Sequence, residues 1–574
     1  MRYEALATDY DGTIARGGHV DEATLAALEE LRRTGRRLLL VTGRTLDDLQ
    51  RVFPHTDLFE RVVAENGAVV HAPGPREARV LAEAPPAAFV DRLRARGVPL
   101  DTGRVIVATA EPHETTVIET IRDLGLELQV IFNKGAVMVL PSGVNKATGL
   151  LRALGEMGLS PHNVVGVGDA ENDHAFLAVC ECAAAVANAL PTLKERADVV
   201  TRADHGAGVA ELIRALVDSD LAEVEPRLAR HHILLGRGPD GEAIAVPPYG
   251  VNVILAGTSG SGKSTLTQGF LERLAAARYQ FFVIDPEGDY AGLQGAVVLG
   301  DSKRVPAVEE VVRLLEDPGR SGVANLLGLP MAHRPEHFEA LLAAVSDLRA
   351  RTGHPHWVVI DEAHHVLPAE HARASQGVPR RLRGAFLITV HADRIAPEVL
   401  QEVGLALTVG SEPGETLRRF ARVVGARPPR VREPSLAPGE AIAWRPADPR
   451  RAPVLFHVAP PDGERRRHVR KYAEGELGPD RSFYFRGPDD RLKLRVQNLS
   501  LFNQIAEGLD DETWLFHLRR GDYSRWFREA IKDEDLAREA AAVEQDESLA
   551  PGESRARLRE AIEARYTAPA ESSR

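Results

Sequence analysis

Residues 1–13 of the chain read MRYEALATDYDGT, a short apolar segment followed by two carboxylates one residue apart. The apolar run Ala5–Ala7 predicts a β-strand, and Asp9 and Asp11 then stand where that strand opens into a loop. In this position both carboxylates can face one ligand. One can attack phosphorus as a nucleophile, while the other protonates the leaving oxygen and then activates water. We assign these two roles to Asp9 and Asp11; a strand-end turn with a capping aspartate is the alternative.

The sequence around this segment alternates short apolar runs with helical stretches. Apolar runs at Leu38–Val41, Val62–Ala64 and Val164–Val167 predict further strands, and Glu22–Arg33 has the pattern of a helix. This alternation is typical of a parallel α/β sheet. We therefore predict an α/β domain over residues 1–218.

Three further motifs follow in order along this domain. Thr42 in VTGR stands at a strand end and helix start, where its hydroxyl and the free backbone N–H groups can hold phosphate. Lys146 in GVNK is one of few lysines and can neutralise charge on the phosphoryl group or the nucleophile. Asp169 in GVGDAEND provides an oxygen ligand that suits a hard cation such as Mg²⁺.

Together these motifs resemble the haloacid dehalogenase superfamily, in the branch with Cof-type, phosphoglycolate and sucrose-phosphate phosphatases. The resemblance spans residues 1 to about 216 and implies a Rossmann-like domain with an α+β cap at about residues 80–140. In that family the cap chooses the substrate, and Asn133-Lys134-Gly135 is a possible contact loop here. By this resemblance Asp9 is the nucleophile, Asp11 is the acid and base, and Thr42 and Lys146 bind phosphate. The implied magnesium-site residues are Asp9, Asp11 through its carbonyl, Asp169 and Asp173, and Asn172 and Asp173 match positions that support the ligands.

A second phosphate-binding motif, GTSGSGKS at residues 257–264, follows the apolar run Val251–Ala256 and precedes a helical stretch. This strand-loop-helix context is the one that a P-loop requires. Backbone N–H groups of the loop would cradle phosphates, Lys263 would reach the β- and γ-phosphates, and Ser264 would bind Mg²⁺. A glycine-rich loop without a ligand is the alternative. The predicted ATP-binding residues are Gly257, Gly260, Gly262, Lys263, Ser264 and Thr265.

The predicted strand Trp357–Ile360 ends in two adjacent carboxylates, as a Walker B motif does. We assign Mg²⁺ binding to Asp361 and the polarisation of water to Glu362. His391 ends the next predicted strand, Phe386–Val390, and either senses the γ-phosphate or only begins a loop. Two more runs, Phe281–Ile284 and Leu405–Val409, predict the remaining strands of a second α/β domain.

The P-loop, FVIDPEGDY at residues 282–290 and DEAHH at residues 361–365 together resemble the HerA/FtsK-like ATPases, over about residues 229–446. Those proteins are ring-forming translocases, so the resemblance implies a homo-oligomer with an arginine finger acting across the ring. The candidate fingers are Arg380, Arg381, Arg383 and Arg418. Two features depart from the family: His391 stands in place of the sensor glutamine, and no N-terminal barrel module is recognisable.

The remaining segments are predicted to connect or to interact rather than to catalyse. Residues 219–228 form a polar linker, and residues 447–497 a second linker rich in proline and arginine. The basic run at residues 464–471 either contacts phosphates or is solvated. Amphipathic helices predict a small helical domain at residues 498–574, and the stretch 517–537 faintly resembles a helical domain of unknown function.

Composition sets limits on the possible functions. With 574 residues, 44% hydrophobic and 27% charged, the chain is long enough for about three or four globular domains. A net charge of −12 excludes a uniformly basic nucleic-acid-binding protein. The two cysteines, Cys180 and Cys182, are too close for an ordinary disulfide and are expected to be small buried residues. Because no signal segment and no long apolar run occurs, we expect a cytoplasmic protein with no membrane partner.

Three functions fit these observations. The first is a Mg²⁺-dependent hydrolase of a phosphorylated small molecule, fused to an ATPase that regulates, delivers or assembles it. The second is a nucleic-acid translocase whose phosphatase domain processes DNA ends or removes phosphoglycolate. The third is a nucleotide-switched scaffold. Salt-sensitive stimulation of ATP hydrolysis by DNA would favour the second, and ATP-dependent assembly without a DNA effect would favour the third.

Overall fold

The computed structural model describes residues 1–224, 228–369, 383–432, 435–448, 452–461, 477, 481–531, 533–546 and 548–566. Arg380, Arg381 and the basic run at residues 464–471 lie outside the described residues. The chain divides into two compact units. The first contains residues 1–232 with the short pieces 316–319 and 346–354, and the second contains the rest.

The first unit is built on an eight-stranded sheet with the strand order β12-β11-β10-β1-β2-β3-β4-β5. Its strands are β1 (Ala5–Asp9), β2 (Arg37–Val41), β3 (Arg61–Ala64), β4 (Val69–Ala72), β5 (Glu77–Val80), β10 (Val164–Gly168), β11 (Cys182–Ala185) and β12 (Val199–Val200). The strands from β12 to β3 are parallel, and β4 and β5 continue the sheet antiparallel. The α/β prediction for this part of the chain is confirmed, because uninterrupted apolar runs form its buried strands.

Strand order explains where ligands can reach this sheet. The chain moves from β1 to β2 and β3 on one side, and β10 returns to the other side of β1. Such a switch of direction leaves a crevice at the carboxyl ends of the two strands. Asp9, the last residue of β1, and Asp169, which follows β10, both lie at this crevice.

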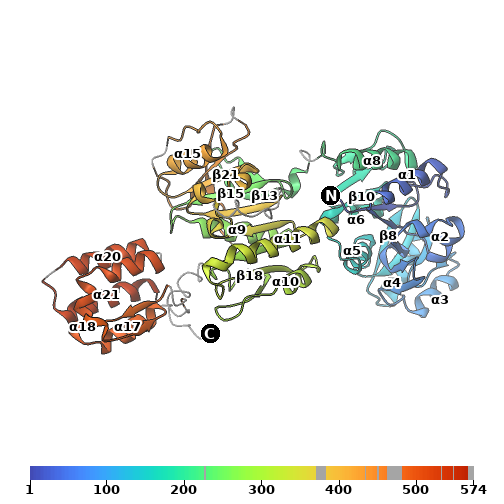
Figure 1. The fold of residues 1–574 in the computed structure, drawn as a ribbon. Helices are drawn as coiled ribbons and strands as arrows, with labels where there is room; N and C mark the ends of the chain where they lie inside the picture. Colours follow the sequence, from blue (N-terminus) through green and yellow to red (C-terminus); the bar gives the residue numbers. More distant parts are fainter. Residues whose placement is uncertain are drawn as a thin grey trace. The chain divides into compact units, whose positions relative to one another are not determined.

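Helices surround this sheet. α1 (Glu22–Arg33) packs against α8 (His205–Ser219), and α5 (Lys146–Glu156) packs against α6 (His174–Val179) (Figure 1). The other helical segments are α2 (Leu46–Val52), α7 (Pro191–Lys194), η1 (Thr56–Leu58), η2 (Glu65–Gly67), η3 (Pro161–Asn163), η4 (Glu171–Asp173) and η6 (Ala229–His231). Cys180 and Cys182 are buried free thiols, as predicted.

A cap interrupts the first unit between β5 and α5. It contains α3 (Ala87–Ala95), β6 (Asp101–Thr102), β7 (Val107–Ala110), α4 (Glu114–Asp123), β8 (Leu128–Asn133) and β9 (Ala136–Pro141). Its four strands form an antiparallel sheet with the order β6-β7-β9-β8. An apolar cluster joins the cap to the larger domain, because Val105, Ile106, Met138 and Leu140 of the cap pack with Ala68.

The second unit contains an eleven-stranded sheet with the order β14-β13-β23-β22-β21-β15-β20-β19-β16-β18-β17. Its strands are β13 (Ile233–Arg237), β14 (Ala243–Val246), β15 (Asn252–Gly257), β16 (Phe281–Asp285), β17 (Ala296–Leu299), β18 (Ser321–Asn325), β19 (Trp357–Ile360), β20 (Ala385–Thr389), β21 (Val403–Val409), β22 (Glu440–Trp444) and β23 (Val454–Val458). The strands from β17 to β21 are parallel, and β22, β23, β13 and β14 continue the sheet antiparallel.

The helices of this sheet lie between its successive strands in the chain. They are α9 (Lys263–Ala276), α10 (Val308–Leu315), α11 (Arg334–Thr352), α12 (Ala363–Val366), α14 (Pro397–Leu400) and α15 (Pro413–Val424), with the turns η7 (Met331–His333) and η8 (Ala392–Arg394). β20 lies between β15, which leads into the P-loop, and β19, which leads into the acidic pair. The end of β20 therefore lies between the two motifs.

The C-terminal part of the second unit is a small helical domain with a two-stranded hairpin. Its elements are β24 (Phe483–Phe485), β25 (Leu494–Val496), α17 (Leu499–Gly508), α18 (Asp511–Leu518), α19 (Asp522–Trp526), the π-helical turn η10 (Phe527–Ile531), α20 (Glu534–Gln545) and α21 (Pro551–Tyr566). Phe483 and Phe485 share one apolar core with Phe502, Trp514 and Tyr523.

These segments correct the expectation of a linker over residues 447–497. β23 belongs to the large sheet, and the β24–β25 hairpin packs with the C-terminal helices. Strands of three to five residues within a charged sequence carry too little periodicity to be recognised.

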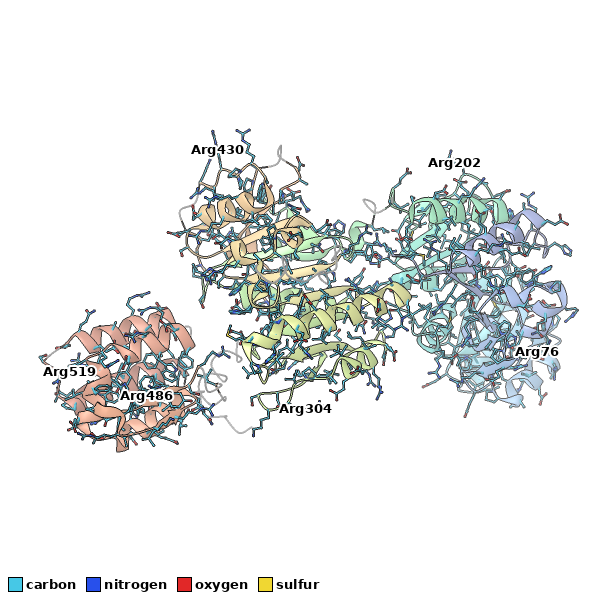
Figure 2. The ribbon with its side chains drawn as sticks, in the orientation of Figure 1. Arg76, Arg202, Arg304, Arg430, Arg486 and Arg519 are labelled. Atoms are coloured by element: carbon cyan, nitrogen blue, oxygen red, sulfur yellow. The ribbon has the colours of Figure 1, made fainter. Side chains whose placement is uncertain are left out.

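Two features of the whole chain bear on possible partners. No described helix is long and apolar enough to cross a membrane. Arginine side chains are spread over both units: Arg76 and Arg202 project from the first, and Arg304 and Arg430 from the second (Figure 2).

Candidate functional site

The crevice at the ends of β1 and β10 gathers several charged side chains that lie far apart in the sequence. Lys146 is 1% exposed, and its Nζ lies 2.6 Å from Asp9 Oδ1 and 2.6 Å from Asp173 Oδ1. Asn145 places this lysine, because its side chain caps α5 by accepting from the backbone N–H groups of Ala147 and Thr148. Lys146 is therefore the first residue of the helix and is directed at the two carboxylates.

Burial and charge act in opposite directions on this pair. Burial, and then the charge of Asp173, raises the pKa of Asp9, although Lys146 lowers it. Burial favours the neutral form of Lys146, but Asp173 and Asp9 raise its pKa above the usual value. A further cation at this site would stabilise the ionised form of Asp9.

Oxygen atoms of Asp9, Asp169 and Asp173 all lie within 4.8 Å of one another. Such a set of carboxylates fits a hard divalent cation. Asp173 already has partners, since its Oδ2 accepts from the backbone N–H groups of Asp169 and Ala170 at 2.8 and 2.9 Å. Asp9 and Asp169 are therefore the better candidates for direct ligands, and Asp173 holds the loop that carries Asp169.

Thr42 and Asp11, the other predicted residues, lie at the same strand ends. Thr42 is 1% exposed and its hydroxyl accepts from the Arg44 backbone N–H at 3.1 Å. Both carboxylate oxygens of Asp11 are held by Arg44, at 2.6 Å from Nε and 2.8 Å from Nη2. Both oxygens of this carboxylate are thus occupied by the Arg44 guanidinium. The role of Arg44 was missed, although it lies in the VTGR motif.

The cap contacts the crevice in two places. Lys134, in the turn between β8 and β9, forms an ion pair with Asp169. Glu65 is 1% exposed, and its carboxylate accepts from the backbone N–H groups of Arg104, Val105 and Ile106 at 2.8–3.0 Å. Sequence motifs indicated Lys134 only as part of a possible contact loop, and no motif gave a signal for Glu65.

The comparisons with known proteins identify the class of protein that this fold and site define. The family profile of the haloacid dehalogenase-like hydrolases matches residues 6–84 and 100–213, and the profile "Helicase HerA, central domain" matches residues 253–351. The chain belongs to the haloacid dehalogenase-like hydrolase family through its first unit. It carries a HerA-type domain after that unit.

Curated relatives of the first unit include archaeal proteins named phosphoglycolate phosphatase. The protein of Methanothermobacter thermautotrophicus is 35% identical over 219 residues, which are 37% of this chain and 97% of that protein. The protein of Haloarcula marismortui is 31% identical over 219 residues, 36% of this chain and 95% of that protein. The protein of Halorubrum lacusprofundi is 30% identical over 223 residues, 37% of this chain and 96% of that protein. The first unit thus has the extent of a whole enzyme.

The second site begins at the P-loop between β15 and α9. Gly260 and Gly262 have φ angles of 73° and 98°, which allow the loop to turn its backbone toward a ligand. Lys263 Nζ donates to the carbonyl oxygens of Gly257 and Thr258 at 2.9 Å each. Ser264 and Thr265 follow in the first turn of α9, next to the loop.

The acidic pair lies at the end of β19 in the same unit. Asp361 is 6% and Glu362 is 8% exposed. Burial, followed by the charges of Asp289 and Glu362, raises the pKa of Asp361 well above its usual value. A divalent cation would offset this concentration of negative charge.

The structure adds a histidine to this second site. His364 Nδ1 lies 3.1 Å from Thr389 Oγ1 and 3.4 Å from Glu362 Oε2. The ring of His391 meets that of His364 edge to face, with centroids 5.4 Å apart. The end of β20 and the acidic pair are thus connected through His364. Of the predicted arginine fingers that the structure describes, Arg418 pairs with Glu415 of its own helix at 3.0 Å.

Proposed function

We propose that the first unit hydrolyses a small phosphomonoester with Mg²⁺, through an aspartyl-phosphate, the acyl phosphate of Asp9. The observation that carries this proposal is the position of Lys146, which is buried between Asp9 and Asp173. Asp9 ends β1, and β1 pairs with β10, the strand that leads into the Asp169 loop. A lysine in this position can neutralise the charge that accumulates during phosphoryl transfer.

In the proposed reaction an Asp9 oxygen attacks phosphorus, and the ester oxygen leaves with a proton from Asp11. Asp11 then takes a proton from water, whose oxygen attacks the phosphoryl group, releases inorganic phosphate and restores the Asp9 carboxylate. Thr42 and Lys146 bind phosphoryl oxygens in both steps. When bound by Asp9, the Asp11 carbonyl and Asp169, Mg²⁺ supplies positive charge beside the phosphoryl group.

The names of the archaeal relatives support phosphoglycolate as the first substrate to assay. The test is a screen of phosphorylated metabolites and 5′- or 3′-phosphorylated DNA ends, with Mg²⁺ and with EDTA. We expect release of inorganic phosphate from a small phosphomonoester only with Mg²⁺. Absence of hydrolysis across the panel, or hydrolysis of DNA ends alone, contradicts the proposal.

We propose that the second unit binds and hydrolyses ATP with Lys263, Ser264, Asp361 and Glu362, and that it forms a homo-oligomer. The strand order of the sheet supports this proposal. The P-loop follows β15 and the acidic pair follows β19, so both lie at the carboxyl ends of the parallel strands, with β20 between them. In Lys263→Ala we expect loss of ATP binding by calorimetry and unchanged phosphatase turnover without ATP. Lys303→Ala, which alters an exposed lysine of the same unit, is the matched control. Unchanged ATP affinity in Lys263→Ala contradicts the assignment.

A nucleic-acid translocase is the second candidate for this unit, and the HerA central-domain match favours it. It predicts ATP hydrolysis that DNA stimulates and salt suppresses. A nucleotide-switched scaffold instead predicts ATP-dependent assembly that DNA does not change.

A further inference from the structure

Two histidines and a glutamate meet at the amino ends of the strands in the first sheet, opposite the catalytic crevice. His162 lies in η3, just before β10, and Glu181 directly precedes β11. Because β10 and β11 are parallel neighbours, the residues that precede them lie at the same end of the sheet. Asp9 and Asp169 lie at the carboxyl ends of β1 and β10. The histidine and glutamate cluster is therefore separate from the catalytic site.

The second histidine, His231, comes from η6. In the chain this turn is followed by β13, the first strand of the second unit. The neighbouring Arg230 holds η6 in place, since its Nη2 donates to the Glu181 carbonyl oxygen at 3.2 Å and to Asp198 Oδ2 at 2.7 Å. His231 is thereby brought to the Glu181 carboxylate.

One oxygen of that carboxylate faces both imidazole rings. Glu181 Oε2 lies 2.8 Å from His162 Nδ1 and 3.9 Å from His231 Nδ1. The other oxygen, Oε1, accepts from Arg2 Nη2 at 2.9 Å, which fixes the orientation of the carboxylate. One possible ligand atom of each of the three residues lies within 4.8 Å of the other two.

These separations are close to those of a tetrahedral metal site. With bonds of about 2.0–2.2 Å, the ligand atoms around Zn²⁺ lie about 3.4 Å apart. The two measured distances fall on either side of this value, so shifts of about half an ångström bring the ligands into place. His231 Nε2 is buried without a hydrogen bond to any described residue, so no hydrogen bond at that atom opposes a small rotation of the ring.

The donor atoms distinguish this cluster from the carboxylates of the crevice. Imidazole nitrogen suits Zn²⁺, whereas Mg²⁺ prefers oxygen ligands alone. The side chains of His162, Glu181 and His231 are 10%, 1% and 14% exposed, which leaves little access for a substrate. Water is then the fourth ligand, and the role of the metal is structural.

We propose that His162, Glu181 and His231 bind one Zn²⁺ ion, which fastens the segment that leads into the second unit to the sheet of the first unit. The ion joins residues from three separate segments of the chain. It stabilises the folded first unit, because the three ligands are together only in that state.

The test measures Zn²⁺ binding to the full chain by calorimetry, in millimolar Mg²⁺ to occupy the carboxylate sites. We expect one Zn²⁺ per chain that EDTA removes. In His231→Ala and in His162→Ala we expect the Zn²⁺ affinity to fall at least about 100-fold, because a direct ligand is lost. His55→Ala, which removes an exposed histidine of the same unit, is the matched control and should bind Zn²⁺ as the wild type does.

Two further measurements report on the same site. Co²⁺ in place of Zn²⁺ should give the visible absorption of a four-coordinate ion, and Zn²⁺ should raise the Tm of the first unit in the wild type but not in His231→Ala. Circular dichroism shows whether each variant is folded, and His162→Ala serves as the test if His231→Ala does not fold.

Equal Zn²⁺ affinity in the wild type and in the folded variants would overturn the inference. Absence of Zn²⁺ binding to the wild type, or the spectrum of six-coordinate Co²⁺, would overturn it as well. None of these measurements depends on phosphatase or ATPase activity, so they test the metal site independently of the proposed function.

Discussion

The charged groups next to Asp9 influence whether its carboxyl group is ionised. Lys146 contacts it directly, and Asp173, which shares the same ammonium group, opposes its ionisation. An amide in place of the Asp9 carboxylate keeps the shape of the side chain but removes the nucleophile.

We therefore expect Asp9→Asn to lower phosphatase kcat by at least about 1,000-fold. ATP hydrolysis should stay at the wild-type rate, because the P-loop belongs to the other unit. Both activities can be measured on one preparation. Asp91→Asn, which alters an exposed carboxylate of the cap helix α3, should change neither activity. Phosphatase turnover that persists in Asp9→Asn would contradict the assignment of the nucleophile.

Single residues could be proposed from the sequence where the motif itself defines the chemistry. Asp9, Lys146 and Asp169 were identified from strand ends and charge, and the structure places them in one crevice. The ion pair of Asp11 with Arg44 could not be predicted, because the rotamers of two partly buried side chains depend on the loops around them.

At the scale of elements, the turn after β3 connects the cap to the larger domain. Glu65 and Asn66 have φ angles of 51° and 54°, which turn the chain so that the Glu65 carboxylate meets the cap loop. One carboxylate there accepts from three backbone N–H groups. A glutamine can present only one oxygen to those donors.

In Glu65→Gln we expect faster hydrogen exchange at the backbone amides of Arg104, Val105 and Ile106, because their charged acceptor is lost. The loss of a hydrogen bond to a charged group corresponds to about 1.5–3 kcal/mol of local stability, or roughly 10- to 100-fold in the exchange rate. Exchange can be measured by mass spectrometry of peptides that contain the loop. Glu77→Gln, at an exposed position of β5, should leave the rates unchanged. Equal protection of the loop in Glu65→Gln would show that the contact does not hold the cap.

Element types followed from the sequence where an apolar run was long enough. The predicted strands Trp357–Ile360 and Leu405–Val409 correspond to β19 and β21, which lie inside the large sheet. The hairpin of β24 and β25 was missed because each strand has three residues, and only the aromatic core of the C-terminal domain stabilises it.

At the scale of the whole molecule, the two cysteines report on one unit. Cys180 and Cys182 are the only cysteines in the chain, and both are buried in the first unit. Their reaction with a thiol reagent therefore measures the unfolding of that unit alone, although the chain has several domains.

The same unit contains a partly buried histidine whose pKa is lowered. His231 lies 3.9 Å from Glu181, and burial lowers its pKa below the ordinary 6.5. The charged or titratable groups around it are Glu181, Arg230, His162 and Asp198. Because the folded state binds its proton less readily than the unfolded state, stability is complete above about pH 6.5 and falls as the pH decreases toward the lowered pKa.

We expect the free energy of unfolding of the first unit to decrease below pH 6.5 by up to about 1.4 kcal/mol per pH unit from this histidine. His231→Gln should reduce that slope, and His55→Gln, at an exposed position, should not. Thiol labelling of Cys180 and Cys182 against urea at several pH values provides the measurement. An identical slope in His231→Gln would assign the pH dependence to other groups.

The sequence by itself determined the class of each unit, because the catalytic motifs and the strands that carry them are continuous segments with their own local pattern. It determined that Asp9 and Lys263 belong to separate α/β domains. Only the tertiary structure decided that Lys134 meets Asp169, that Glu65 binds the cap loop and that Arg44 holds Asp11. These contacts join segments distant in the chain, so they exist only once the cap has packed on the sheet.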